Sequence, residues 1–265
     1  MKHNQCTALI TGASAGIGWE FARQLAPSAK LLVLVARRQE RLEQLRNELS
    51  SRHPKLEIHI RAVDLSDPEQ LKGLTDWLTT NEIDLDLLIN NAGIGALGPV
   101  AVTDPRRLEQ IVLVNINALT LLTRAVLPGM ISRNHGAILN VSSCASFLPI
   151  PGFAVYAASK AYVTSFTEAL RTELRATNIT VSALCPGPVH TEFTGVAHPS
   201  GTQHYPAPEF VHVAVEKVVR MGLAGVERNQ PIVIPGVVMR IAMFITRMTP
   251  MPILRLTSRR SQRGN

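Results

Sequence analysis

The sequence predicts an α/β fold: a doubly wound, Rossmann-like parallel sheet of about seven strands with helices on both faces, in a single domain over residues 1–265. Short, uninterrupted apolar runs, as at 7–11 and 31–36, are typical of strands buried on both faces of a parallel sheet. Segments with helical periodicity alternate with them, as at 39–51, where leucines recur at three- and four-residue spacing. No Pro/Gly/Ser-rich linker and no internal repeat interrupts this alternation.

The expected elements follow one another in a regular order. Strands are predicted at residues 7–11, 31–36, 57–63, 85–90, 136–142, 179–185 and 231–234. Helices are predicted at about 16–25, 39–51, 68–80, 105–133, 153–177 and 208–224. Right-handed crossovers bring the carboxyl ends of parallel strands, with the loops that follow them, to one edge of the sheet. We therefore expect the functional side chains at this edge.

The composition favours one large aliphatic core and a cytoplasmic location. Apolar residues make up 46% of the chain and aromatic residues only 5%. Cys6, Cys144 and Cys185 are too few and too far apart for a disulfide framework, and the eight histidines form no ligand cluster, so we expect no metal. The odd cysteine count fits a reducing compartment, and the first strand begins too early to leave room for a signal peptide.

The net charge of +7 belongs to a basic, apolar C-terminal tail, residues 236–265. This tail contains six arginines and no acidic residue, which leaves a charge of +1 for the rest of the chain. Without interleaved aromatic residues such a tail is only a generic electrostatic signal, so no nucleic-acid partner is expected. The arginines are Arg240, Arg247, Arg255, Arg259, Arg260 and Arg263.

The first part of this tail has the pattern of an amphipathic helix. Arg240 and Arg247 are seven residues apart and share one side, with apolar residues such as Ile241 and Phe244 around the other. Three interpretations stay open: the segment packs over the substrate pocket or a partner subunit, it contacts an anionic membrane surface peripherally, or it is disordered. It has no run of about 18 uncharged apolar residues, so a membrane span is not expected.

A glycine-rich turn after the first strand predicts a dinucleotide site. Gly12, Gly16 and Gly18 stand where that strand gives way to a helix. Glycines allow a tight turn and leave no side chain between the backbone and a pyrophosphate, and the helix N-terminus attracts negative charge. Three glycines in a loop are often only a turn, so this motif gains weight from the residues that follow.

The end of the second strand indicates NADP(H) rather than NAD(H). NAD-binding proteins usually carry an acidic residue there for the ribose 2′-hydroxyl, whereas this chain has Ala36 followed by Arg37 and Arg38. Guanidinium groups bind a 2′-phosphate through charge-assisted hydrogen bonds. Arg37 is the main candidate, and an alternative reading of Arg38 makes it the first residue of a solvated helix.

Two further strand ends supply candidate cofactor contacts. Asp64 ends the third strand, where its carboxylate would either accept from the adenine amino group or cap the turn before Pro68. Asn91, Ala92 and Gly93 follow the fourth strand, and Gly93 lets the chain pass close to a ribose.

Tyr156 and Lys160 form a candidate acid–base pair. They are four residues apart, so they share one face of the predicted helix. A free phenol has a pKa of about 10, and a nearby ammonium together with an oxidised nicotinamide would lower the pKa of Tyr156. Ser143 ends the fifth strand, where its hydroxyl could hydrogen-bond a reacting carbonyl oxygen. An isolated Tyr-x-x-x-Lys pair is common by chance, but the serine spacing and the glycine-rich turn make it specific.

These motifs together resemble the short-chain dehydrogenase/reductase family of the single-domain type. The resemblance runs from Thr7 to about Thr191. It rests on Thr11-Gly-x-x-x-Gly-Ile-Gly18, Asn90-Asn-Ala-Gly93, Asn115, Ser143, Tyr156-x-x-x-Lys160, and Pro186-Gly187 with Thr191. One departure is Ala15, where relatives that prefer NADP often carry a basic residue, and this leaves Arg37 as the main determinant of coenzyme choice.

The resemblance implies a role for each matched residue. Tyr156 is the acid in reduction and the base in oxidation, Ser143 positions the carbonyl, and Lys160 holds the nicotinamide ribose and perturbs Tyr156. Asn115 would bind a water that links Lys160 to solvent. The remaining cofactor contacts implied by the family are Ser14, Ile17, Pro186, Gly187, Val189 and Thr191. Long helices corresponding to 105–133 and 153–177 pair subunits in relatives, so a homodimer or homotetramer is expected.

The residues expected around the carbonyl are uncharged, which favours a lipophilic substrate. Ala145 and Phe153 are the main candidates beside Ser143 and Tyr156, and residues 188–225 would form a substrate lid. His190 and His198 are expected to be ordinary loop residues. Further residues of the expected pocket and lid are Cys144, Phe147, Leu148, Pro149, Pro188, Phe193, Val196, His204 and Tyr205.

The sequence thus predicts an NADP(H)-dependent oxidoreductase that interconverts a lipophilic ketone or aldehyde and an alcohol. A 3-oxoacyl-thioester reductase is the nearest alternative. A different class, a cofactor-binding sensor or interaction protein with negligible turnover, would not need all of Ser143, Tyr156 and Lys160.

Overall fold

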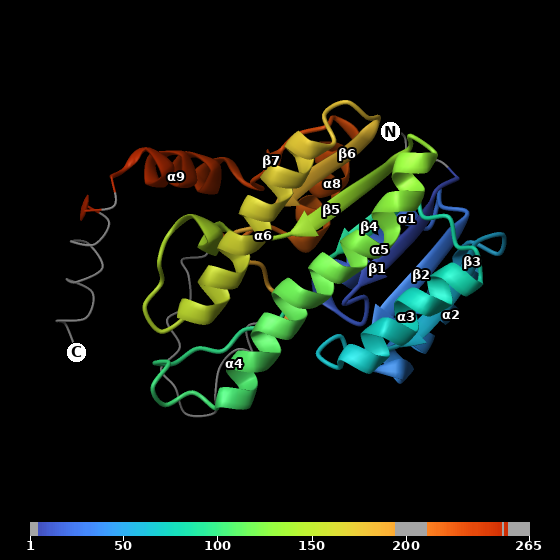
Figure 1. The fold of residues 1–265 in the computed structure, drawn as a ribbon, viewed down its shortest axis with the longest axis horizontal. Coiled ribbons are helices and arrows are strands. Elements are labelled where there is room, and N and C mark those ends of the chain that lie inside the picture. Colours follow the sequence, from blue (N-terminus) through green and yellow to red (C-terminus); the bar gives the residue numbers. More distant parts are fainter. Residues whose placement is uncertain (1–4, 194–210, 251, 254–265) are drawn as a thin grey trace.

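The computed structural model describes residues 5–193, 211–250 and 252–253, which form a seven-stranded parallel sheet between helices (Figure 1). The strand order is β3-β2-β1-β4-β5-β6-β7. Successive strands are therefore added toward one edge of the sheet from β1 to β3, and toward the other edge from β4 onward. This reversal makes the sheet doubly wound and confirms the predicted fold class. The strands are β1 (Thr7–Thr11), β2 (Leu31–Ala36), β3 (Glu57–Ala62), β4 (Leu87–Asn90), β5 (Gly136–Val141), β6 (Ile179–Leu184) and β7 (Ile232–Val233).

Helices cover both faces of the sheet. The helices α1 (Gly16–Leu25), α2 (Gln39–Arg52) and α8 (Val215–Glu227) pack on one face, and α3 (Pro68–Thr80), α5 (Leu119–Ser132) and α6 (Ala154–Glu173) pack on the other (Figure 1). Successive strand residues supply the two cores in turn: Ala8 and Ile10 of β1 belong to the first, and Leu9 belongs to the second. The central strands are therefore mostly apolar, as their sequences predict, with Asn90, Asn140 and Ser182 as buried polar exceptions.

The predicted helix over 105–133 is continuous but not uniformly α-helical. It consists of α4 (Pro105–Val112), a π-helical turn η1 (Leu113–Ala118) and α5. By length and composition alone, Pro105–Arg133 could cross a membrane. Its inner side, including Leu122 and Met130, belongs to the core, so we interpret it as a core helix with an exposed outer side.

Two helices differ from their predicted bounds. The helix expected at 208–224 begins only at Val215, because the preceding Ala214 is extended with ψ 139°, while residues 208–210 lie outside the described residues. The helix expected to reach residue 177 ends at Glu173. The other elements agree with the predicted positions to within about two residues, which is the usual uncertainty of element ends.

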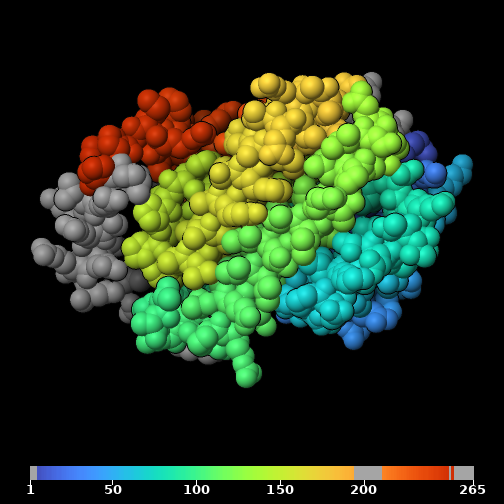
Figure 2. Space-filling model, viewed as in Figure 1, coloured from blue at the N-terminus to red at the C-terminus, as the bar shows by residue number. Residues whose placement is uncertain are grey.

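The C-terminal tail begins with a helix, α9 (Val237–Met248), that belongs to neither layer. It lies at one margin of the molecule (Figures 1 and 2) and packs on a short 3₁₀ helix, η2 (Cys144–Phe147), which follows β5. Of the three interpretations of the tail, the structure therefore favours packing on the protein's own fold for this helix. Residues 251 and 254–265 lie outside the described residues.

Candidate active site

A cavity of about 1550 Å³ runs along the carboxyl ends of the strands. It is large enough for a dinucleotide and a second small molecule, since typical ligand pockets measure roughly 300–1,000 Å³. It brings together 19 predicted site residues: Gly12, Ser14, Gly16, Ile17, Arg37, Arg38, Asp64, Asn91, Ala92, Gly93, Ser143, Ala145, Phe153, Tyr156, Lys160, Pro186, Gly187, Val189 and Thr191. Gly18 and Asn115 do not line it.

The glycine-rich turn connects β1 to α1 at one end of this cavity. Gly12 has φ +68° and Gly16 has φ +53°, a backbone region that side chains disfavour. Gly18 has a different role from the predicted cofactor contact. A Cβ there would lie 2.2 Å from the Gly12 carbonyl oxygen and 2.5 Å from Asn91 Nδ2, so Gly18 permits close packing of helix against strand.

Asn91 braces the glycine-rich turn from the neighbouring strand. Its Nδ2 donates to the Thr11 carbonyl at 2.8 Å and to the Gly12 carbonyl at 3.3 Å. The backbone N–H groups of Asn91 and Ala92 both donate to Thr11 Oγ1 at 3.0 Å. The Asn91 side chain thus holds the turn, and Asn91 also lines the cavity, so its predicted contact with the cofactor stays a prediction.

The two arginines after β2 have different surroundings. Arg37 is half-exposed and its Nη1 lies 3.9 Å from Asp64 Oδ2. Arg38 does not simply begin a solvated helix: its Nε lies 3.3 Å from Ser14 Oγ and its Nη1 2.9 Å from a Glu192 carboxylate oxygen. Both arginines line the cavity, and their contact with a 2′-phosphate stays a prediction.

Asp64 performs the turn role that the sequence left open. Its Oδ1 accepts from the backbone N–H of Ser66 at 2.9 Å and from the Ser66 hydroxyl at 2.7 Å. The actual N-cap of α3 is Asp67, whose side chain accepts from Glu69 and Gln70. The contact of Asp64 with an adenine amino group stays a prediction.

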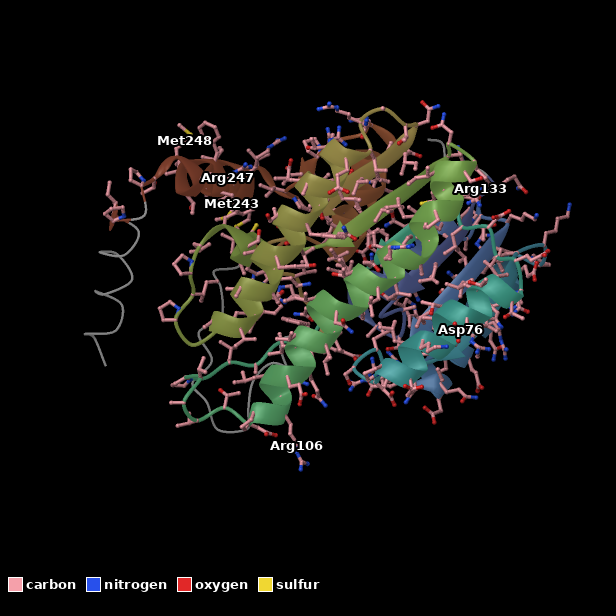
Figure 3. All side chains as sticks on the ribbon, in the orientation of Figure 1. Asp76, Arg106, Arg133, Met243, Arg247 and Met248 are labelled. Carbon is pink, nitrogen blue, oxygen red and sulfur yellow. The ribbon has the colours of Figure 1, made fainter. Side chains whose placement is uncertain are left out.

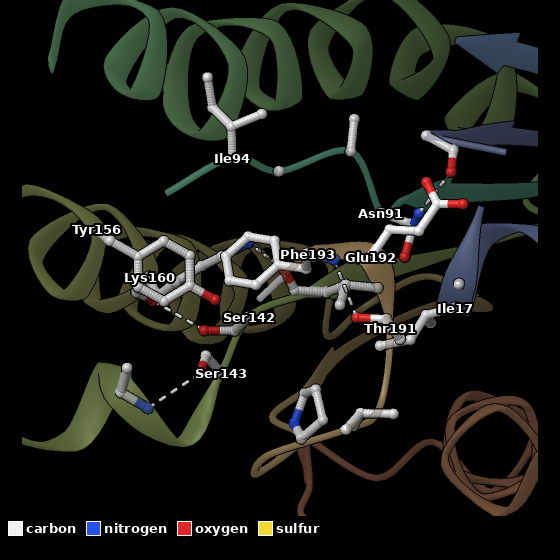
Figure 4. Close-up of a pocket in the computed structure, with 18 of the residues that line it drawn as sticks. Ile17, Asn91, Ile94, Ser142, Ser143, Tyr156, Lys160, Thr191, Glu192 and Phe193 are labelled. Carbon is white, nitrogen blue, oxygen red and sulfur yellow. Dashed lines mark hydrogen bonds between the residues drawn. The ribbon is translucent and has the colours of Figure 1, made fainter. Parts of the chain in front are cut away.

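Tyr156, Lys160 and Ser143 converge at the other end of the cavity (Figure 4). Tyr156 and Lys160 lie on α6 and are 8% and 4% exposed, with Lys160 Nζ 5.7 Å from the centre of the Tyr156 ring. Ser143 directly precedes η2, and its Oγ accepts from the Ala145 N–H at 3.1 Å. The neighbouring Ser142 instead donates to the Lys160 carbonyl, so the spacing argument for Ser143 agrees with the geometry.

Lys160 is held in place by the end of β5. Its ammonium donates to the Val141 carbonyl at 2.8 Å, and burial lowers the pKa of Lys160 to about 8. A Cβ on Gly93 would lie 3.1 Å from Lys160 Nζ, so a glycine there keeps space beside the ammonium. The ammonium is thus positioned by the backbone of β5 and the Gly93 turn.

Asn115 lies on the π-helical turn η1 and is 1% exposed. Its amide group forms a pair of hydrogen bonds with the backbone of Ile94, and its Nδ2 also donates to Ser159 Oγ at 2.9 Å. Asn115 therefore anchors the turn after Gly93 to α6. A π-helical turn at this point fits a functional position, but the predicted water relay stays a prediction.

Residues 6–200 match the family model described as short chain dehydrogenase. The chain belongs to the short-chain dehydrogenase family. A very-long-chain 3-oxoacyl-CoA reductase of Phaeosphaeria nodorum is 36% identical over 81% of this chain, which spans 64% of that reductase, less than two thirds of its length. The NADP-dependent 3-hydroxy acid dehydrogenase YdfG of Escherichia coli is 37% identical over 71% of this chain and 75% of that protein.

A solved structure supports the same assignment. The short-chain dehydrogenase from Sphingobium yanoikuyae in complex with NADPH superimposes with a TM-score of 0.78, at 32% identity over 88% of each chain. Membership of this family supports an oxidoreductase of CH–OH groups, and the NADP-dependent relative and the NADPH complex support NADP(H) as the cofactor. The residues of this chain fit that cofactor, because the positive-φ turn, the two arginines and the length of the cavity provide for pyrophosphate, 2′-phosphate and nicotinamide in turn.

In the protein without a bound cofactor, the pKa of Tyr156 is shifted upward and not downward. Burial raises the pKa of Tyr156 to about 12, and the hydrogen bond with Ser143 opposes this rise without cancelling it. The Lys160 ammonium donates to the Val141 carbonyl, and the protein alone therefore does not produce the predicted lowering. The Lys160 ammonium, 5.7 Å from the centre of the Tyr156 ring, and a bound cationic nicotinamide stay the predicted sources of stabilisation for a phenolate.

The substrate end of the cavity has aromatic and aliphatic walls. The Phe153 ring stacks on the Tyr156 ring with centroids 4.2 Å apart, and the Phe193 ring lies 5.3 Å away on a tilt. His190 lines the cavity and stacks on His212 at 4.1 Å, so it is more than an ordinary loop residue. Apolar lining residues are Ile94, Leu97, Pro99, Leu148, Ile150, Pro188, Met239 and Met243.

Sequence reasoning missed several residues of this site. Glu192 follows Thr191 and pairs with Arg38 and with Arg41, at 3.3 Å from the latter, but no motif marks it. Met239 and Met243 come from the tail, where only helical periodicity hinted at a packed face. The predicted lid residues Val196, His198, His204 and Tyr205 lie outside the described residues.

Proposed function

We propose that this short-chain dehydrogenase interconverts a lipophilic ketone or aldehyde and its alcohol with NADP(H). The observation that carries the proposal is the position of the Tyr156–Ser143 pair, where the polar groove of the cofactor site meets an apolar recess. A carbonyl oxygen hydrogen-bonded by both hydroxyls would leave the rest of the substrate against Phe153 and Phe193. A recess of this kind suits hydrocarbon better than a phosphate or carboxylate.

The proposed mechanism assigns one task to each side chain. When bound, the nicotinamide supplies the hydride for reduction or accepts it in oxidation. Ser143 orients the carbonyl oxygen, and the Tyr156 hydroxyl gives it a proton as negative charge develops. Lys160, held by the Val141 carbonyl, stabilises the phenolate left behind. Asn115 keeps the turn at Ile94 and the helix of Tyr156 in register.

The proposal is tested by measuring NADPH consumption with a panel of aldehydes, diketones, acyl thioesters and steroid ketones. We expect turnover with lipophilic ketones or aldehydes and much slower turnover with NADH. Failure of every carbonyl compound in the panel, with NADPH binding intact, would favour a cofactor-binding sensor. Faster turnover with NADH would contradict the roles given to Arg37 and Arg38, whose guanidinium groups line the cavity.

A 3-oxoacyl-thioester reductase is the second candidate. The relative from Phaeosphaeria nodorum, named for very-long-chain 3-oxoacyl-CoA, favours it. An acyl chain would fit the same apolar recess. The two candidates differ in the thioester, so a matched pair of a 3-oxoacyl thioester and the corresponding simple ketone distinguishes them by kcat/KM.

The pH dependence of the two directions is expected to differ. Oxidation requires the phenolate of Tyr156, whereas reduction requires the phenol, and burial raises the pKa of this group to about 12. From about pH 6 to about pH 7, below the Lys160 pKa of about 8, kcat/KM for oxidation should rise about ten-fold per pH unit. Reduction should show no such rise, because the phenol predominates throughout this range. An oxidation rate that stays flat in steady-state assays over the same range would contradict the base role.

We further propose a cytoplasmic homo-oligomer whose C-terminal tail contacts a membrane surface. Val112, Leu121 and Tyr162 are 44%, 46% and 36% exposed on the outer side of the long helices, and Tyr162 Oη lies 2.9 Å from Thr120 Oγ1. Aliphatic and aromatic groups on adjacent helices provide an interface for a second copy.

Substitution of Leu121 with glutamate should disrupt this interface. Two copies of the charge would face each other across a two-fold axis, where like charges and unpaired carboxylates are costly. We expect size-exclusion chromatography with light scattering to give a dimer or tetramer for the wild type and a smaller species for Leu121→Glu. Val102→Glu, on a residue that is 78% exposed before α4, is the control. Equal molar masses for all three proteins would exclude this interface.

A further inference from the structure

Helix α9 contributes one of its sides to the substrate cavity. Met239 and Met243 line the cavity, and Met243 is only 8% exposed. Met239 approaches the chain so closely that a Cβ on Gly187 would lie 2.9 Å from its Cγ. Arg247 lies at the margin of this contact, with its guanidinium carbon 5.5 Å from the centre of the Phe147 ring. The helix is therefore a wall of the proposed active site and is held there by specific contacts.

The opposite side of α9 is apolar and faces solvent. It carries six aliphatic, aromatic or thioether side chains, and Figure 3 shows this helix with Met243, Arg247 and Met248 at the margin of the molecule. We call these residues the outer face: Val237, Val238, Ile241, Phe244, Ile245 and Met248, which are 62%, 49%, 56%, 66%, 59% and 70% exposed. Exposed apolar residues scattered singly need no explanation, but six on one helix side indicate an interaction surface.

The charge around the outer face restricts its partner. Arg240 and Arg247 border it, and neither forms an ion pair with a described acidic residue. The whole segment 236–265 contains six arginines and no aspartate or glutamate. A second copy of the chain packed on this face would bring two sets of these arginines together, and like charges repel. A partner surface that is both apolar and anionic would match the apolar outer face and the positive charge of the arginines.

We propose that α9 binds an anionic lipid surface, and that the carbonyl substrate of the proposed function reaches the cavity from that surface. The helix would lie in the plane of the headgroups with its outer face among the acyl chains and Arg240 and Arg247 beside the phosphates. Only the thickness of one helix, about 10 Å, would then separate lipid from the cavity wall at Met239 and Met243. The substrate class is accordingly a carbonyl compound that partitions into membranes.

Vesicle co-sedimentation of the full-length protein tests the docking. Vesicles of phosphatidylcholine and phosphatidylglycerol in a three-to-one ratio are compared with vesicles of phosphatidylcholine alone. We expect wild-type protein to sediment only with the anionic vesicles and Phe244→Glu to lose binding by a factor on the order of ten or more. Neutralising one arginine, as in Arg240→Gln, should weaken binding about five-fold.

Val102→Glu is the matched control, because it places the same charge on an exposed apolar residue far from α9 in sequence. It should bind the anionic vesicles as the wild type does. If Val102→Glu and Phe244→Glu lost vesicle binding equally, the change in net charge alone would explain the loss, and the proposal would be overturned. The proposal would also be overturned if the wild-type protein stayed in the supernatant with anionic vesicles. A Phe244→Glu variant with a lower molar mass than wild type by light scattering would overturn it too, because that result would assign the outer face to a second copy of the chain.

Substrate delivery is tested with two ketones and the same variants. Phe244→Glu should reduce a long-chain ketone dissolved in the vesicles at least five-fold more slowly than wild type, and a short water-soluble ketone at the wild-type rate. Equal rates for the vesicle-dissolved ketone would overturn delivery from the surface. Vesicle binding without reduction of either ketone by the wild type would uphold the docking and count against the proposed function alone.

Discussion

Tyr156→Phe is expected to lower kcat for carbonyl reduction by a factor on the order of 10² to 10⁴ while NADPH affinity stays within about two-fold. The substitution removes the hydroxyl that gives the proton in the proposed mechanism, but it keeps the ring that stacks on Phe153. Steady-state kinetics and fluorescence titration with NADPH measure the two quantities separately. A loss of kcat without a loss of coenzyme affinity would identify an acid at the reacting oxygen.

Tyr162→Phe is the control for this experiment. Tyr162 lies on the same helix α6, but its side chain is exposed and its hydroxyl contacts only Thr120 among the described residues. The control removes the same atom six residues along the helix, so any general effect on helix stability should appear in both variants. Unchanged kcat in Tyr156→Phe, or an equal fall in both variants, would contradict the proposed mechanism.

Gly18→Ala is expected to destabilise the protein by about 3 kcal/mol and to abolish detectable NADPH binding. The added methyl group would lie 2.2 Å from the Gly12 carbonyl oxygen and 2.5 Å from Asn91 Nδ2, both of which belong to the brace of the glycine-rich turn. The first neighbour is backbone, and the second is the end of a side chain that hydrogen bonds hold to the Thr11 and Gly12 carbonyls. The turn must therefore move, and with it the residues of the turn that line the cavity.

Gly73→Ala is the matched control. Gly73 lies inside helix α3, and a Cβ there would meet no described atom within 4 Å. Alanine in such a position is favoured over glycine by roughly 0.5–1 kcal/mol, so this variant should be slightly more stable than wild type. Chemical denaturation gives the free energies, and isothermal titration gives the coenzyme affinity. Wild-type stability in Gly18→Ala would show that the contact with Gly12 does not constrain the turn.

The fold was predictable because its elements are encoded locally. Each central strand is a mostly apolar run of four to six residues, and the layer helices show an apolar side at three- and four-residue spacing, as with Leu42, Leu45 and Leu49. The less certain bounds occur where context overrides pattern. Helix α8 begins at Val215 because the extended residue Ala214 precedes it, and no local signal for that extended residue is visible in the sequence.

The positions of Tyr156, Lys160 and Ser143 were predictable for the same reason. A four-residue spacing places two side chains on one helix side, and the end of a parallel strand places a third at the common edge of the sheet. Their electrostatics were not predictable. Burial raises the pKa of Tyr156 to about 12 and lowers that of Lys160 to about 8, and burial depends on every element packed around them.

The sequence by itself determined the individual strands, the glycine-rich turn and the acid–base helix, because each depends on residues within a few positions of one another. Only the tertiary structure decided that Asn91 braces Gly12, that Arg38 meets Glu192, and that α9 turns Met243 inward and Phe244 outward. These contacts join segments up to about 150 residues apart. Such contacts depend on how the whole chain packs, so they cannot be predicted from the local periodicity of the sequence.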